Sequence, residues 1–193
     1  GRYMVYRVES DGVLNLFAYD LESGTSRMLN RPNRSPGGWL NRNSESLLRH
    51  DGVTNFEIVP GERSVSYTSD EEREGRYLLY QVSLDGGQPT VLSPSRAGAS
   101  DEPSYYGVDR DFKMAPNGKF AMFKYHPINW FRYSPDLYIV DLSTKNHIRI
   151  NPEGTYAVNN NGVSPNSTHV VFLAKEPYSN DIPGLYRLFS YKI

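Results

Sequence analysis

An ungapped segment of 15 residues recurs three times and constrains the fold more than any other feature of the chain. The copies occupy residues 16–30, 79–93 and 137–151. In each copy apolar and polar residues alternate with the period of a β-strand, and Gly, Asn or Ser stands where a hairpin has to turn. Each copy therefore predicts two antiparallel strands joined by a short turn.

A second repeated unit, a turn led by proline and then an apolar strand, precedes the first. It occupies residues 60–67, 116–123 and 165–172, and residues 1–6 fit the same frame without the proline. A further short strand comes before the turn, most clearly at 55–58 and 111–114. Four antiparallel strands per repeat are typical of a propeller blade. The sequence therefore predicts an all-β fold, a β-propeller of about four blades.

The repeated residues resemble a known family. Ala115-Pro116-Asn117-Gly118-Lys119 followed by Leu137-Tyr138-Ile139-Val140-Asp141-Leu142, and Ser164-Pro165-Asn166-Ser167 followed by Leu185-Tyr186, are similar to the TolB-like (PD40) propeller repeat, which is related in form to WD40. The resemblance covers nearly the whole chain and implies the propeller fold. It implies no single function, because propellers carry many unrelated activities.

The spacing of the repeats predicts how the chain is organised. We expect one propeller domain over residues 1–193, with blades at about 1–30, 53–93, 110–151 and 157–193. The long connections, at 31–52, 94–109, 127–135 and 177–183, leave an antiparallel meander at the same end, so one face should be elaborated for binding. The first blade lacks its first strand and the last blade its fourth. We therefore expect a partial propeller, either a piece of a larger protein or one that self-associates through open blade edges.

Composition argues against several partners and cofactors. The net charge of −1 provides no basic field for nucleic acid, and no apolar run is long enough to insert into a membrane. Cysteine is absent, and the four histidines lack the spacing of paired metal ligands, so we expect neither a metal nor a cofactor. We expect a periplasmic or secreted location rather than a cytoplasmic one.

Candidate binding residues concentrate in two of the long connections. Aromatic and arginine side chains dominate protein-binding hot spots, and the residues of this kind, with one histidine, are Tyr105, Tyr106, His126, Trp130, Arg132 and Tyr133. Alternatively, Trp130 fills a gap between blades and residues 101–106 are solvated. No serine lies in a Gly-x-Ser-x-Gly elbow. The sequence therefore favours a non-catalytic module that binds a protein or peptide.

Two smaller motifs have structural interpretations. The acidic run 70–74 lies between two strands and is predicted to be a solvated hairpin tip, with a cation or basic-partner site as the alternative. Asp20 and Asp141 occupy matching positions and are predicted to fix their turns, because a residue repeated in every blade serves the blade.

A second resemblance provides the alternative function. Residues 111–125, followed by Trp130, Arg132, Tyr133 and Ser134, are similar to a blade of the dipeptidyl peptidase IV propeller. In that family the propeller screens substrates for an α/β-hydrolase domain with a Ser-Asp-His triad. No such domain is encoded here, and the family's substrate-binding Glu pair is not recognisable at Glu71-Glu72. On this interpretation the chain is the propeller segment of a prolyl-oligopeptidase-like peptidase and is not an enzyme by itself.

Overall fold

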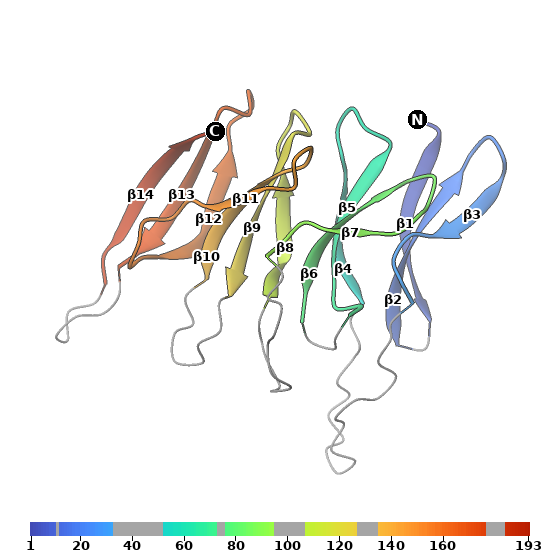
Figure 1. Ribbon diagram of the computed structural model, residues 1–193, viewed down its shortest axis with the longest axis horizontal. Helices are drawn as coiled ribbons and strands as arrows, with labels where there is room; N and C mark the ends of the chain where they lie inside the picture. The colour runs from blue at the N-terminus through green and yellow to red at the C-terminus, as the bar shows by residue number, and fades with distance from the viewer. Residues whose placement is uncertain (11, 33–51, 73–75, 95–106, 127–134, 177–183) are drawn as a thin grey trace, which may run out of the picture.

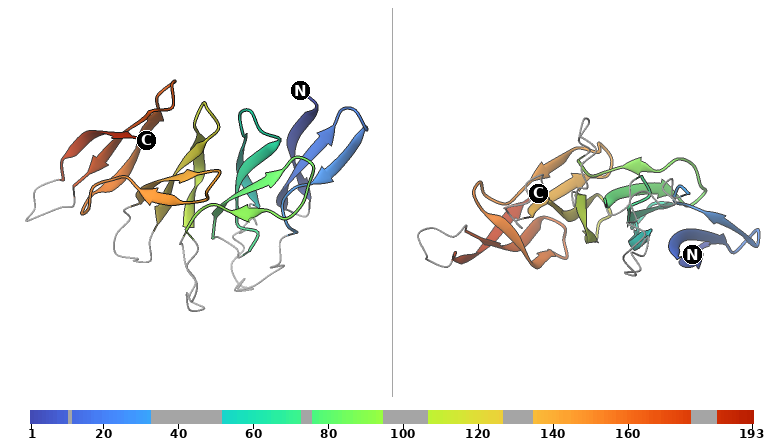
Figure 2. Two further views of the ribbon diagram at one scale, coloured as in Figure 1. Left: turned by 45° about the horizontal axis from the view of Figure 1, so that its top comes forward. Right: turned by 90° about the horizontal axis from the view of Figure 1, so that it is seen from below.

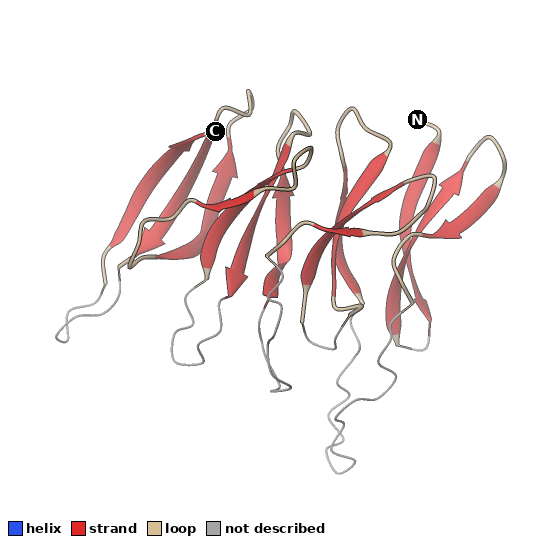
Figure 3. Cartoon of the chain, in the orientation of Figure 1, coloured by secondary structure: helices blue, strands red, loops and turns tan. Residues whose placement is uncertain are grey.

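The described structure is built of β-strands alone. The computed structural model describes residues 1–10, 12–32, 52–72, 76–94, 107–126, 135–176 and 184–193, and Figure 3 shows strands joined by turns and loops. The described part contains no helix that could cross a membrane. The strands form four antiparallel sheets, so the all-β prediction is confirmed.

The four sheets, which we call blades 1 to 4, stand side by side along the chain (Figure 1). Blade 1 consists of β1 (Tyr3–Ser10), β2 (Val13–Asp20) and β3 (Thr25–Met28). Blade 2 consists of β4 (Val53–Ile58), β5 (Ser64–Ser69), β6 (Leu78–Ser83) and β7 (Thr90–Val91). Blade 3 consists of β8 (Gly107–Met114), β9 (Phe120–His126), β10 (Asp136–Asp141) and β11 (His147–Arg149). Blade 4 consists of β12 (Tyr156–Val163), β13 (His169–Lys175) and β14 (Tyr186–Lys192).

Each blade is a meander, because strands that pair are consecutive in the sequence. Figure 2 shows the blades following one another with their faces opposed, as in a propeller. At one edge of this row, at the bottom of Figure 1, β5 and β9 end and β6, β8 and β10 begin. We call it the loop edge, because the long connections of the sequence leave from it.

Neighbouring blades are joined by backbone hydrogen bonds at the loop edge. The N–H of Val108 in blade 3 donates to the carbonyl of Tyr77 in blade 2 at 2.8 Å, and the N–H of Ala157 in blade 4 donates to Pro135 at 2.7 Å. Gly107 permits the first of these contacts: its φ is +143°, and a Cβ there would lie 2.2 Å from the Tyr77 oxygen. The same approach recurs where Leu14 bridges to Gly52.

Stacked aromatic pairs fill the blades. The partners face each other across the second and third strand positions of each blade, with ring centroids 5.2–5.8 Å apart. The pairs are Tyr6–Phe17, Tyr67–Tyr80, Phe123–Tyr138 and Phe172–Phe189. Offset aromatic stacking adds about 1 kcal/mol per pair to the burial of the rings. This repeat explains why a chain rich in Tyr and Phe folds as strands.

Repeated polar residues close the hairpins. Asp141 Oδ1 accepts the N–H of Ser143 at 2.8 Å, and Asp20 Oδ1 accepts the N–H of Glu22 at 3.0 Å. The prediction that these two residues fix turns is confirmed. Ser83 stands at the matching position of blade 2, and its hydroxyl accepts the second N–H after it at 3.1 Å. The replacement of Asp by Ser therefore preserves the turn.

A second polar repeat caps the third strand of three blades. The side chain of Asn151 accepts the buried N–H of Leu137 at 2.8 Å, and Asn30 does the same for Leu16 at 2.7 Å. In blade 2 the hydroxyl of Ser93 serves Leu79 at 3.2 Å. These buried polar residues satisfy backbone groups that would otherwise lack a partner. Leu16, Leu79 and Leu137 therefore occupy equivalent places in their blades.

Candidate binding site

A charged cluster lies at the loop edge of blade 3. Asp109 stands near the start of β8, and His126 and Lys124 come from the end of β9. Nε2 of His126 lies 2.5 Å from Oδ1 of Asp109, and the Lys124 ammonium forms an ion pair with the second carboxylate oxygen. All three side chains are at least partly buried, with exposed fractions of 34%, 28% and 15% for His126, Asp109 and Lys124. We call this group the Asp109 cluster.

The pKa of Asp109 is below its ordinary value. Burial raises this pKa, but the hydrogen bonds from His126 and Lys124 and the charge of Lys124 lower it by more. Asp109 is therefore a carboxylate at neutral pH, and as an acceptor it binds both donors. The cluster fixes the end of β9 against the start of β8.

The cluster lies where the predicted binding segments join the fold. His126 is the one predicted binding residue that the structure describes; Tyr105, Tyr106, Trp130, Arg132 and Tyr133 lie outside the described residues. In the sequence, the first two directly precede β8 and the other three follow β9. Their placement stays a prediction. The described structure shows that the strand ends on which both segments depend are fastened to each other.

A bulge in β8 directs side chains to two sides. Val108 pairs with Tyr125 and Phe112 with Phe123, so three residues of β8 lie opposite Lys124 alone. Bulges of this kind re-aim side chains and are common beside binding sites. Hydroxyls of blade 2 hold the bulge, because Thr68 donates to the carbonyl of Arg110 at 2.9 Å.

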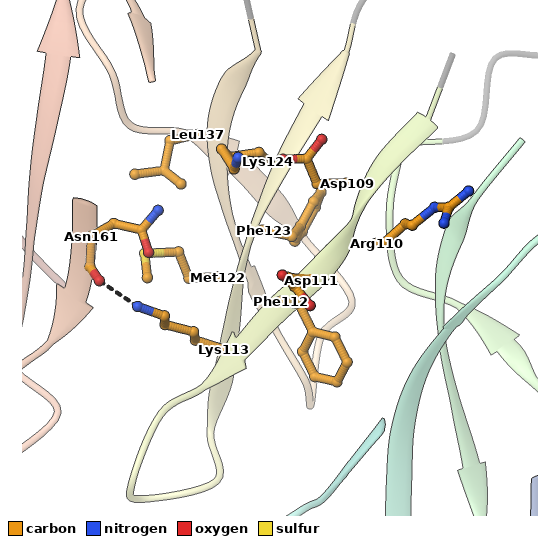
Figure 4. Close-up of a pocket in the computed structure, with 10 residues that line it drawn as sticks. All are labelled: Asp109, Arg110, Asp111, Phe112, Lys113, Met122, Phe123, Lys124, Leu137 and Asn161. Carbon is orange, nitrogen blue, oxygen red and sulfur yellow. Dashed lines mark hydrogen bonds and ion pairs between the residues drawn. The ribbon is translucent and has the colours of Figure 1, made fainter. Parts of the chain in front are cut away.

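A cavity of about 600 Å³ lies between β8 and β12, next to the Asp109 cluster. Figure 4 shows Met122 and Leu137 on its apolar side, with Lys113, Lys124 and Asn161 around them. The ammonium of Lys113 donates to the carbonyl of Asn161 at 2.5 Å and so links blade 3 to blade 4. A cavity of this size, apolar with a few polar groups, is typical of ligand sites. In the part of the chain that is described, no group of acidic and histidine side chains is arranged to hold a metal.

The acidic run at 70–74 is a contact between blades, and its interpretation as a solvated tip is wrong for Asp70 and Glu71. Both are buried. Asp70 accepts the N–H of Gly52 at 3.1 Å, and Glu71 accepts the N–H of Arg31 at 3.1 Å and the hydroxyl of Tyr67 at 3.2 Å. These acceptors from blade 2 bind backbone on either side of the connection from blade 1. Burial raises the pKa of Glu71 to about 7.

Comparison with known proteins places the fold but not a family. No protein-family model matches the sequence, and no curated protein does. Among solved structures, TolB from Acinetobacter baumannii matches with a TM-score of 0.53 at 15% identity, over 100% of this chain and 38% of that one. The β-propeller domain of the Trilobed protease from Pyrococcus furiosus matches with a TM-score of 0.55 at 9% identity, over 100% of this chain and 52% of that one.

A structure from work on two prolyl endopeptidases matches with a TM-score of 0.53 at 16% identity, over 76% of this chain and 21% of that one. The chain therefore spans from about a fifth to about half of the length of these three structures. At such low identities the likeness concerns the fold. The predicted TolB-like resemblance is confirmed at that level: this chain has the fold of part of a β-propeller, of the kind found in TolB and in propeller-bearing peptidases.

Proposed function

We propose that this chain is a non-catalytic propeller module that binds a protein or peptide at the loop edge of blade 3. The observation that carries the proposal is the Asp109 cluster, which fastens the strand ends beside both aromatic segments and borders a cavity of about 600 Å³. A fixed scaffold lowers the entropy lost when a loop binds. His126 is a positioning residue in this proposal, and the contacts come from Tyr105, Tyr106, Trp130, Arg132 and Tyr133.

The pairing of charges supports binding rather than catalysis. Asp109 is bonded to His126 and Lys124, and Lys113 to a backbone carbonyl. Such bonds fix geometry, whereas a catalytic base has to reach a nucleophile or a substrate proton. The module should therefore show no turnover of peptides by itself.

The alternative is the propeller of a prolyl-oligopeptidase-like peptidase. The specific observation in its favour is the fold likeness to the propeller of the Trilobed protease and to prolyl endopeptidases. The parent open reading frame discriminates between the two functions, because a Gly-x-Ser-x-Gly elbow followed by Asp and His downstream would favour the peptidase. In both cases the chain binds peptide, and only in the second does it serve a hydrolase domain.

Location and assembly are also proposals. We place the protein in the periplasm or outside the cell, in line with its TolB-like fold. The outer face of blade 4 exposes Leu188 and Tyr186, and that of blade 1 exposes Met4 and Val8. Apolar sheet faces of this kind bury against another sheet, so self-association through them is proposed. Light scattering tests it: a dimer supports the proposal and a monomer at high concentration refutes it.

Selection from a displayed library of random peptides tests the binding function. Peptides selected on the chain should lose binding to the double variant Trp130→Ala, Arg132→Ala by at least tenfold. The matched control is Leu21→Ala, Lys119→Ala, which truncates an exposed apolar side chain and an exposed cation at the opposite edge. Equal binding to both double variants would refute the proposed surface.

A further inference from the structure

The aromatic pairs of blades 2 and 3 extend onto their first strands. Phe56 of β4 lies opposite Tyr67, and Phe112 of β8 lies opposite Phe123. Each blade thus has a row of three aromatic residues, which we call its aromatic row: Phe56, Tyr67 and Tyr80 in blade 2, and Phe112, Phe123 and Tyr138 in blade 3.

Blade 4 lacks the first member of its row. Its pair Phe172 and Phe189 is present, but the residue of β12 opposite Phe172 is Asn161. All three first strands change register just before this position. The place is therefore equivalent in each blade, and a polar residue occupies it only in blade 4 of the three blades whose first strand is described.

The missing ring accounts for the place of the cavity. In the core between blades 2 and 3, Phe112 is 3% exposed and packs in the cluster that contains Leu79. Phe56 packs against the cluster that contains Leu16, between blades 1 and 2. The equivalent leucine of blade 3 is Leu137, and it lines the cavity together with Asn161 (Figure 4). The cavity thus lies where the other two blade junctions hold a phenylalanine ring.

We propose that this cavity binds an aromatic side chain of a peptide, which completes the aromatic row of blade 4. The shape argument is internal to the molecule, because phenylalanine fills the equivalent place twice. The apolar wall, Met122 and Leu137, is of the kind that receives a ring, and Phe172 provides the neighbouring aromatic position.

The polar groups at the cavity suit a peptide rather than a free hydrocarbon. Asp111 and Lys113 stand on β8, and Lys113 already donates to a main-chain carbonyl, that of Asn161. A peptide main chain beside the ring offers the same carbonyls and N–H groups. The inference deepens the proposed function by naming the side chain that the module selects.

Methyl NMR of the wild-type chain tests the proposal without any partner protein. The side chain of Met122 is 2% exposed and lines the cavity, whereas Met4 and Met28 lie exposed on blade 1. With 13C-methyl methionine, N-acetyl-L-phenylalaninamide should shift the Met122 signal with a Kd on the order of 1 mM. It should leave Met4 and Met28 unshifted. N-acetyl-L-alaninamide, which has no ring, should shift none of them.

Two variants at one position sharpen the test. Asn161→Phe fills the cavity and should weaken binding of the phenylalanine probe at least tenfold, whereas Asn161→Ala leaves the space open and should bind within about threefold of wild type. Unchanged binding to Asn161→Phe, or no shift of Met122 in the wild type, would overturn the proposal. If Asn161→Phe does not fold, the comparison of Met122 with Met4 in the wild type decides.

The outcomes separate this inference from the proposed function. Loss of selected peptides with Trp130→Ala, Arg132→Ala together with no Met122 shift would leave a binding module whose partner avoids the cavity. A Met122 shift with no effect of that double variant would leave an aromatic site whose ligand does not use the loop residues.

Discussion

Replacement of Glu71 by Gln should remove a specific part of the pH dependence of stability. Burial raises the pKa of Glu71 from 4.5 to about 7 in the folded protein. Between these values the folded carboxyl retains a proton that the unfolded chain has released. Its contribution to stability is therefore greatest at pH values below 4.5 and is lost as the pH rises through 7. At 1.4 kcal/mol per pKa unit, the loss is about 3 kcal/mol.

The groups that face Glu71 do not titrate in this window as they stand in the fold. Tyr67 and Tyr80 have pKa values raised above their ordinary range by burial, and Arg31 is a permanent cation. The neutral amide of Glu71→Gln resembles the protonated carboxyl. The variant should therefore gain on wild type by about 3 kcal/mol between about pH 4.5 and pH 8.

Urea denaturation of both proteins across this range measures the difference directly. Glu153→Gln is the matched control, because Glu153 is exposed and its replacement should leave the wild-type pH profile unchanged. Parallel profiles for wild type and Glu71→Gln would refute the argument from burial. A wild type that gains on the variant with rising pH would reverse its sign.

Three further substitutions test the joints of the fold. Gly107→Ala should destabilise by about 3 kcal/mol, since the added Cβ would lie 2.2 Å from a backbone oxygen of the neighbouring blade; Gly61→Ala, at φ +79° in open space, should lose about 1 kcal/mol in the same thermal melts. Asn151→Ala leaves a buried N–H of β10 unpaired and should lose about 2 kcal/mol in urea denaturation, and no loss would refute its role as a cap. Asp109→Asn should lose about 2 kcal/mol at pH 7, with the difference from wild type shrinking at pH values below about 4, because the carboxylate that binds His126 is then protonated in both states. A difference independent of pH would contradict that assignment.

The blades were predictable because their signals are local. Alternation of apolar and polar residues with turn residues at fixed offsets specifies hairpins without long-range information. The aromatic pairs follow from the same alternation, since Tyr67 and Tyr80 stand at matching places of two strands that a meander must pair. The turn role of Asp141 was likewise visible, because its partners are its immediate neighbours.

The burial of Glu71 was not predictable because its partner is distant. In sequence, 70–74 is a polar run with every sign of a solvated tip. The N–H that Glu71 accepts belongs to Arg31, which is 40 residues away on another blade. Such a pair depends on how blades pack, and period-two patterning carries no information about that.

The unusual place of Asn161 had a signal in the sequence. Phe56, Phe112 and Asn161 each stand four residues before the proline of their turn. The comparison of short strands at 55–58 and 111–114 extends to 160–163, where the aromatic residue is missing. The cavity itself required the structure, because only the packing of β12 on blade 3 shows what an absent ring leaves open.

The most direct test of the account is a crystal structure of the chain with a peptide selected on it. The account predicts an aromatic side chain of the peptide against Met122 and Leu137, in line with Phe172 and Phe189, with the rest of the peptide at the loop edge of blade 3. A peptide bound at the opposite edge, or one that leaves the place beside Asn161 without a ring, would contradict it.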